Sequence, residues 1–244
     1  MDGGKHFINW RVFVLFIPFM FVLLTLIYIA NFELYWSLTN EDGLLEWLTF
    51  FSLFFAFLIS FFIKIKIKKY KFSFYWFFLF FTIFLLFSAM EEISWGQRIL
   101  DIKSSGFFIE NSTQGETNVH NLFQKWGRSL PFFGYEYNFK TKHLAGLTLF
   151  LYGAILPIVA LNKRAANFFN QINIVVPPLT LSFSFFLAAL MMIDKPTGRE
   201  EEIGEFLFSV CLLLFIIWEY MKLKEMIVVN NAQVVYGNLE EVRF

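Results

Sequence analysis

Residues 73–100 read SFYWFFLFFTIFLLFSAMEEISWGQRIL, and this stretch decides how the rest of the chain is interpreted. Residues 73–87 contain no charged side chain and are mostly phenylalanine and leucine. Glu91, Glu92 and Arg98 then follow within about two helical turns. A pair of carboxylates at the mouth of an apolar helix is costly in a membrane, so such residues usually have partners and often a function. The stretch therefore predicts a membrane helix that ends in a polar site.

The composition of the whole chain indicates a membrane protein. Of the 244 residues, 57% are hydrophobic and 37 are phenylalanine, and the mean hydropathy is +0.57. A soluble domain of this length has to keep its own surface polar, which this composition does not allow. The formal net charge is zero, which excludes bulk binding of a polyanion such as nucleic acid. The single cysteine, Cys211, lies within an apolar run, which excludes an internal disulfide and disfavours a thiol nucleophile.

Six apolar runs predict an all-α bundle with six transmembrane helices, because each has roughly the ~20 residues that a bilayer requires. The runs lie at about residues 11–31, 45–63, 73–93, 144–162, 177–193 and 203–221. The loop at 64–71 carries lysines and no acid, which places it in the cytoplasm and, with six spans, both termini as well. We therefore expect a multi-pass protein of the cell membrane, inserted N-in and C-in.

Two segments outside the spans have predicted roles. We expect residues 1–225 to form the membrane domain. Residues 226–244 would then be a short cytoplasmic tail, with a candidate hairpin around Asn230 and Asn231. The long connection at 96–143 is expected to be an extracytoplasmic cap. Within this cap, a capping box at 113–116 and helical spacing of apolar residues at 116–126 predict a short amphipathic helix on the membrane face. Residues 131–134, Pro-Phe-Phe-Gly, predict a turn.

Acidic side chains gather at the outer ends of several predicted spans. The candidate metal ligands are Glu46, Glu91, Glu92, Asp194, Glu201 and Glu205. Glu201 and Glu205 share a helix face one turn apart, which suits two oxygens on one cation. Carboxylates with an imidazole such as that of His120 suit Mg²⁺, Mn²⁺, Ca²⁺ or Zn²⁺, so a divalent cation is the expected cofactor. Without a metal, crowded carboxylates would place a general acid beside a general base.

Simpler explanations exist for the same residues. Acids at residues 200–202 complement the dipole at the start of a helix, and Glu91 or Glu92 could pair with Arg98. His120, on the polar side of a surface helix, could simply be solvated.

The leading functional hypothesis is a metal-assisted hydrolase or transferase that acts on a lipid or lipid-linked substrate at the outer leaflet. In this reading Glu91 and Glu92 serve as ligands or as acid and base, His120 as proton shuttle or ligand, and Arg98 as the contact for an anionic head group. Two alternatives stay open: a cation-handling transporter or channel, and a structural subunit of a membrane complex or homo-oligomer. The expected partner is the lipid bilayer, and nucleic acid is not expected.

Overall fold

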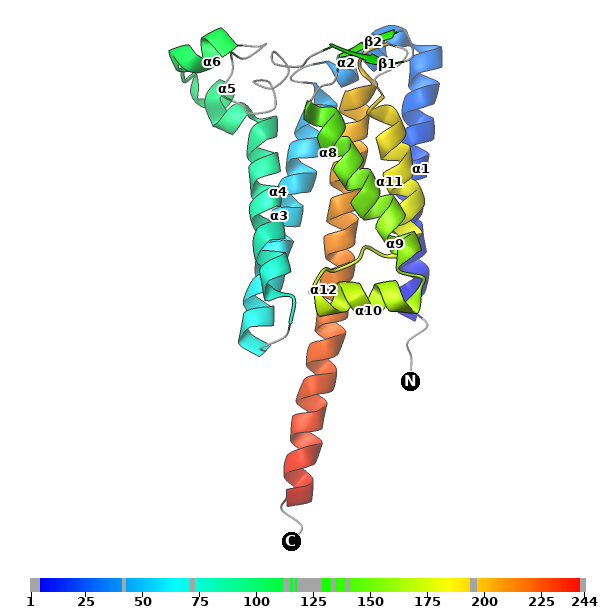
Figure 1. Ribbon diagram of the computed structural model, residues 1–244, viewed down its shortest axis with the longest axis vertical. Helices are drawn as coiled ribbons and strands as arrows, with labels where there is room; N and C mark the ends of the chain where they lie inside the picture. The colour runs from blue at the N-terminus through cyan, green and yellow to red at the C-terminus, as the bar shows by residue number, and fades with distance from the viewer. Residues whose placement is uncertain are drawn as a thin grey trace.

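The computed structural model describes residues 5–40, 43–70, 73–111, 115, 117, 129–132, 135–138, 141–193 and 197–241 (Figure 1). Helices dominate this part of the chain. The two ends of the bundle differ in charge, and we call them the acidic end and the basic end. The acidic end is where α4 (Tyr75–Glu92) finishes and where α3 (Leu44–Tyr70) and α12 (Glu200–Glu241) begin. The basic end is the opposite one, where α3 finishes in lysines.

Helix α12 is the central element of the bundle. It packs against α3 on one side and against α11 (Ser182–Met191) on the other, and α3 packs against α4. Of the most apolar stretch of α12, 67% is buried, against 28% in α3 and in α4. Leu207, Cys211 and Phe215 are fully buried along it. The core therefore runs along α12, while α3 and α4 turn large apolar side chains outward, as helices facing lipid do.

A second group of helices covers the other side of α12. It consists of α1 (Lys5–Ala30) and of a broken rod made of α8 (Thr141–Phe150), a π-helical turn at Leu151–Ile155 and α9 (Leu156–Val159). Helix α11 is preceded by a short 3-10 turn at Leu179–Leu181. Helix α10 (Lys163–Gln171) lies across the basic end, transverse to the bundle (Figure 1).

Short helices and a β-hairpin lie at the acidic end. Asn31 separates α1 from α2 (Phe32–Thr39), because its side chain accepts a hydrogen bond from the Leu34 amide at 3.0 Å and starts a new helix. Helices α5 (Gln97–Leu100) and α6 (Gly106–Asn111) follow α4. An antiparallel hairpin pairs β1 (Ser129–Phe132) with β2 (Tyr135–Asn138). This hairpin is the one departure from the all-α prediction among the described residues.

Three described helices are long and apolar enough to cross a membrane, fewer than the six predicted. They are Leu44–Tyr70, Tyr75–Glu92 and the Glu200–Val229 part of α12, and together they mark the chain as a helical membrane protein. The other predicted spans correspond to shorter apolar helices at Leu15–Ala30, His143–Val159 and Leu179–Met191. Helix α11 is short because the chain before it is extended through Pro177 and Pro178, and its ten residues rise only about 15 Å.

Three local predictions are corrected by the structure. The lysines of the predicted loop at 64–71 continue helix α3 up to Tyr70, because lysine is a good helix former and extending an existing helix is cheap. The predicted hairpin around Asn230 and Asn231 is instead part of α12, since extending a helix that is already formed is cheap. The first half of the turn predicted at 131–134 is strand, since Pro131 and Phe132 belong to β1, and its second half lies outside the described residues. The capping box and amphipathic helix predicted at 113–126 fall almost entirely outside the described residues.

Candidate functional site at the acidic end

Helix α4 ends abruptly at its two carboxylates. Ser94, Trp95 and Gly96 all adopt left-handed backbone angles, with φ of 47°, 57° and 76°. The helix therefore does not continue through Arg98, as a regular extension would require. Even so, the indole Nε1 of Trp95 donates a hydrogen bond to Oε1 of Glu91 at 2.7 Å. The turn folds Trp95 back onto the helix that precedes it, and the Trp95 ring packs edge-on against Phe87.

Left-handed geometry is unfavourable for Ser94 and Trp95, at roughly 1–2 kcal/mol per residue. Only Gly96 adopts it without a steric cost. Such backbone strain persists where surrounding structure enforces it, and it is concentrated at functional sites. Ser94 is fully buried, so its unusual conformation is held by the packed interior rather than by solvent.

Glu92 is the centre of a carboxylate cluster that draws on three helices. Its carboxylate interacts electrostatically with those of Glu205 and Glu202 from α12, Glu46 from α3, and neighbouring Glu91. We call these five residues the acidic cluster. Glu91 is only 6% exposed, and the other four are half-buried. Like charges within electrostatic range of one another in a half-buried site favour compensation by protons, cations or basic side chains.

Glu200 has a different, structural role. Its carboxylate accepts hydrogen bonds from the Thr197 hydroxyl at 2.7 Å and from the backbone amides of Thr197 and Gly198 at 3.0–3.1 Å. The hydroxyl of Tyr35 on α2 donates to it as well, at 3.3 Å. Burial and the nearby Glu200 charge raise the pKa of Tyr35 to about 12, so that this hydroxyl keeps its proton. Glu200 thus fastens the start of α12 to α2.

Gln97 organises the polar segment that follows the left-handed turn. Its amide nitrogen donates to the Ser104 hydroxyl at 2.6 Å, and its amide oxygen accepts from the Thr117 backbone at 2.7 Å. One side chain therefore ties two points of the predicted cap, thirteen residues apart, to the helix next to the acidic cluster.

The predicted site residues have different outcomes. Glu46, Glu91 and Glu205 lie within electrostatic range of Glu92. Glu201 is buried on α12, one turn before Glu205. His120, Asp194 and the side chain of Arg98 lie outside the described part of the chain, so their roles stay predictions.

Two residues of this site are not among the predicted ligands and catalytic residues. The candidate metal ligands include Glu201 and not Glu202, although Glu202 and Glu205 have the i, i+3 spacing that places both on one helix face. Trp95 is not among the predicted site residues either. Its position four residues after Glu91 was the available signal for contact, although the left-handed turn was not foreseeable from it.

A metal ion needs several ligands grouped around one point. Among the described residues, no three His, Cys, Asp or Glu side chains are grouped closely enough to hold one. The expected divalent cation is therefore unsupported by this part of the chain. The chemistry that these carboxylates can perform by themselves is proton transfer.

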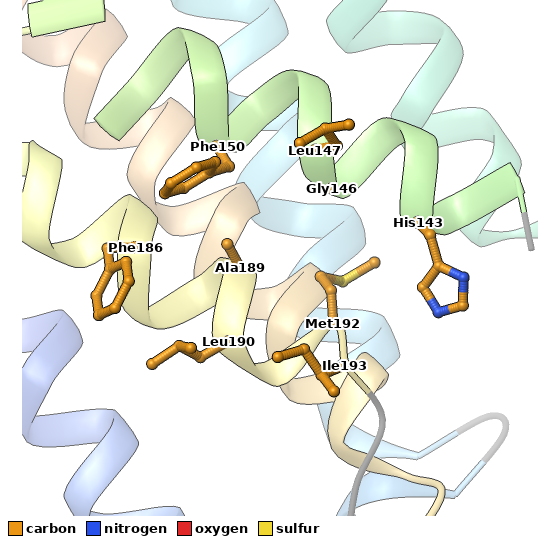
Figure 2. A pocket seen from close by; sticks show the side chains of 9 residues that line it. All are labelled: His143, Gly146, Leu147, Phe150, Phe186, Ala189, Leu190, Met192 and Ile193. Carbon is orange, nitrogen blue, oxygen red and sulfur yellow. The ribbon is translucent and has the colours of Figure 1, made fainter. Parts of the chain in front are cut away.

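An apolar groove lies on another face of the acidic half of the molecule, between α8 and α11 (Figure 2). It has a volume of about 330 Å³, and His143 stands at its end beside Met192 and Ile193. Met192 also lies against Gly204 of α12, where an added Cβ would come within 2.8 Å of its sulfur. Gly204 and Glu205 are about 100° apart around the helix. The groove is thus adjacent to α12 without sharing a lining residue with the acidic cluster.

The fold and this site define a class: a helical membrane protein with a carboxylate cluster where three of its helices end. Comparison with protein-family models, with curated proteins and with solved structures finds no match for the chain.

Proposed function

We propose that this protein is a membrane enzyme that hydrolyses, or transfers a group from, a lipid or lipid-linked substrate at the acidic end. The observation that carries the proposal is the position of Glu92, which lies at the end of α4 within electrostatic range of carboxylates on α3 and α12. Carboxylates at the ends of membrane helices usually have partners and often have a function. The strained turn directly after Glu92 supports the same assignment.

The chemistry follows from the presence of several carboxylates in one half-buried site. One protonated carboxyl would donate its proton to the leaving oxygen as the bond from that oxygen to phosphorus or to a carbonyl carbon breaks. An ionised neighbour would remove a proton from the attacking water, whose oxygen forms the new bond. The cluster then carries as many protons as before. In a transferase, an acceptor hydroxyl replaces the water.

The finer arrangement in the membrane is part of the proposal. We infer that α1, the α8–α9 rod and α11 also cross, which gives six spans in the cell membrane with the acidic end outside. The α8–α9 rod supports this, since residues 141–159 would rise about 28 Å, close to a hydrocarbon core of ~30 Å. The lysines that end α3 support a cytoplasmic basic end.

Purified protein in vesicles of phosphatidylethanolamine and phosphatidylglycerol tests the activity, with mass spectrometry of the lipid products. We expect Glu92→Gln and Glu205→Gln to reduce product formation by about 100-fold or more, because each removes an ionisable group from the acid–base set. Glu33→Gln is the matched control, since Glu33 is an exposed carboxylate on α2 at the same end. Wild-type rates in both cluster variants would refute the proposal.

Chelation decides whether a cation takes part. Loss of activity in EDTA and recovery with one divalent ion would assign a metal that is completed by His120 or Asp194. Activity unaffected by EDTA would leave proton transfer among the carboxylates as the mechanism. If the vesicles instead conduct cations in a way that depends on Glu92, the transporter alternative replaces the enzyme.

A further inference from the structure

Helix α10 differs from every other described helix of similar length in how it is covered. It begins at Asn162, whose side chain accepts a hydrogen bond from the Arg164 amide at 2.9 Å, and it crosses the basic end transverse to the bundle (Figure 1). None of its residues is buried. A helix that packs on the protein so little must be stabilised by something else.

The two faces of α10 indicate what that is. Ala165, Phe168 and Phe169 lie within about 100° of one another around the helix, and Lys163 and Asn167 lie opposite. Phe168 is 54% exposed. A short helix with aromatic residues on one face and basic and amide residues on the other is typical of helices that lie in the plane of a membrane interface.

Contacts of neighbouring residues place α10 at the level of that interface. The chain just after α10 is held where the Val175 carbonyl accepts a hydrogen bond from the Tyr152 hydroxyl at 2.8 Å. Tyr152 lies within electrostatic range of Glu219, which pairs with Lys222 at 2.8 Å. On the same stretch of α12, the amine of Lys222 lies 5.6 Å from the centre of the Trp218 ring, and the amine of Lys224 lies 4.7 Å from the centre of the Tyr220 ring. Aromatic rings with lysines reaching past them mark the boundary between hydrocarbon and water.

Cations from four helices are concentrated at this end. The described ones are Lys5 and Arg11 on α1, Lys64, Lys66, Lys68 and Lys69 on α3, Lys163 and Arg164 on α10, and Lys222 and Lys224 on α12. The described acids in the same stretch of α12 are Glu219 and Glu225, and Glu219 is already paired with Lys222. The excess positive charge therefore lies on α1, α3 and α10.

We propose that α10, together with the lysine-rich end of α3, binds the head groups of anionic phospholipids. The aromatic face of α10 enters the head-group region of the bilayer, and Lys163 and Arg164 at its first turn meet lipid phosphates. Charge complementarity favours a lipid with a net negative head group over a zwitterionic one, because clustered lysine and arginine near a surface attract anionic lipid. A membrane surface, unlike a nucleic acid, also accounts for the exposed Phe168.

The test uses the full chain in vesicles of phosphatidylcholine with a minor share of phosphatidylglycerol. The protein is extracted with its surrounding lipid by a styrene–maleic acid copolymer, and the ratio of the two lipids is compared with that of the vesicle. We expect wild type to be enriched in phosphatidylglycerol by about threefold or more, and high salt to reduce this enrichment. The double variant Lys163→Gln, Arg164→Gln should lose at least half of it.

Lys103→Gln is the matched control, because Lys103 is an exposed lysine at the acidic end. It should leave the enrichment unchanged. Phe168→Ser keeps every charge and should also lower the enrichment, since α10 then loses an aromatic side chain that enters the head-group region of the bilayer. A wild-type protein without enrichment, or an α10 double variant that elutes as a single species and keeps the full enrichment, would overturn the proposal. The result is independent of whether the acidic end is catalytic.

Discussion

At the scale of single residues, three consecutive carboxylates at the start of α12 have three different environments. Glu200 turns back to the amides that precede its helix, Glu201 is buried, and Glu202 lies within electrostatic range of Glu92. Successive helical residues point about 100° apart, so these three side chains enter different surroundings. The helix-dipole explanation suits Glu200, while the functional explanation suits Glu202.

Replacement of Glu200 by alanine is expected to destabilise the protein. The change leaves the amides of Thr197 and Gly198 and the Tyr35 hydroxyl without their acceptor, which costs about 1–3 kcal/mol for a buried group. For a chain of this length, that corresponds to a fall in melting temperature of about 2–4 °C per kcal/mol. Thermal unfolding in detergent measures it. Glu33→Ala, which removes an exposed carboxylate from α2, should leave the melting temperature within a degree or so of wild type.

The acids that converge could be predicted from sequence better than their exact identities. Glu46, Glu92 and Glu205 each lie at the end of an apolar run, and neighbouring runs in a bundle bring their ends together. Whether Glu201 or Glu202 points toward the other acids depends on how α12 is rotated about its own axis. That rotation is set by which face of the whole helix is buried. The left-handed turn at Ser94 and Trp95 could not be predicted, because both residues disfavour it locally and only tertiary packing enforces it.

At the scale of elements, the α8–α9 rod shows how a break in a helix serves packing. At the π-helical turn, Gly153 lies so close to α11 that an added Cβ would be 2.1 Å from Cγ of Phe185. Phe185 is itself fully buried. The rod can therefore approach α11 only because residue 153 has no side chain, in keeping with the role of small residues at membrane helix interfaces.

Gly153→Ala should consequently force the rod away from α11. We expect a loss of stability of about 1–3 kcal/mol, the usual cost of overpacking a filled core. Gly106→Ala is the matched control: Gly106 has nothing within 4 Å of its added Cβ and lies in helix α6, where alanine is accommodated. The double variant Gly153→Ala, Phe185→Leu should recover part of the loss. Equal melting temperatures for Gly153→Ala and wild type would show that the interface yields easily.

Element lengths illustrate where sequence patterns succeed and where they mislead. The predicted run at 73–93 agrees with α4 to within two residues, because the left-handed turn at residues 94–96 ends the helix where the apolar run ends. By contrast, α3 and α12 continue well past their apolar runs, since polar residues such as lysine do not stop a helix that is already formed. Hydropathy therefore indicates which residues the membrane covers, but it does not indicate where a helix begins or ends.

At the scale of the whole molecule, the bundle separates two kinds of charge along its long axis. The acidic cluster lies where α4 ends, and lysines from α3, α10 and α12 lie at the other end (Figure 1). Such a separation is expected for a protein inserted in one direction, because positive residues are retained on the cytoplasmic side. The acidic cluster, whose residues weigh little in insertion, is then better explained by function.

The number of crossings can be decided by cysteine accessibility, since Cys211 is the only cysteine of the chain. In a Cys211→Ser background, single cysteines at Lys103, Lys69 and Lys163 are probed with a membrane-impermeant maleimide, before and after cells are permeabilised. Six spans with the acidic end outside predict that Lys103→Cys reacts in intact cells and that the other two react only after permeabilisation. Lys163→Cys is the decisive position, because it follows the α8–α9 rod. If only α3, α4 and α12 cross, this rod returns to the side it came from, and Lys163→Cys will react together with Lys103→Cys.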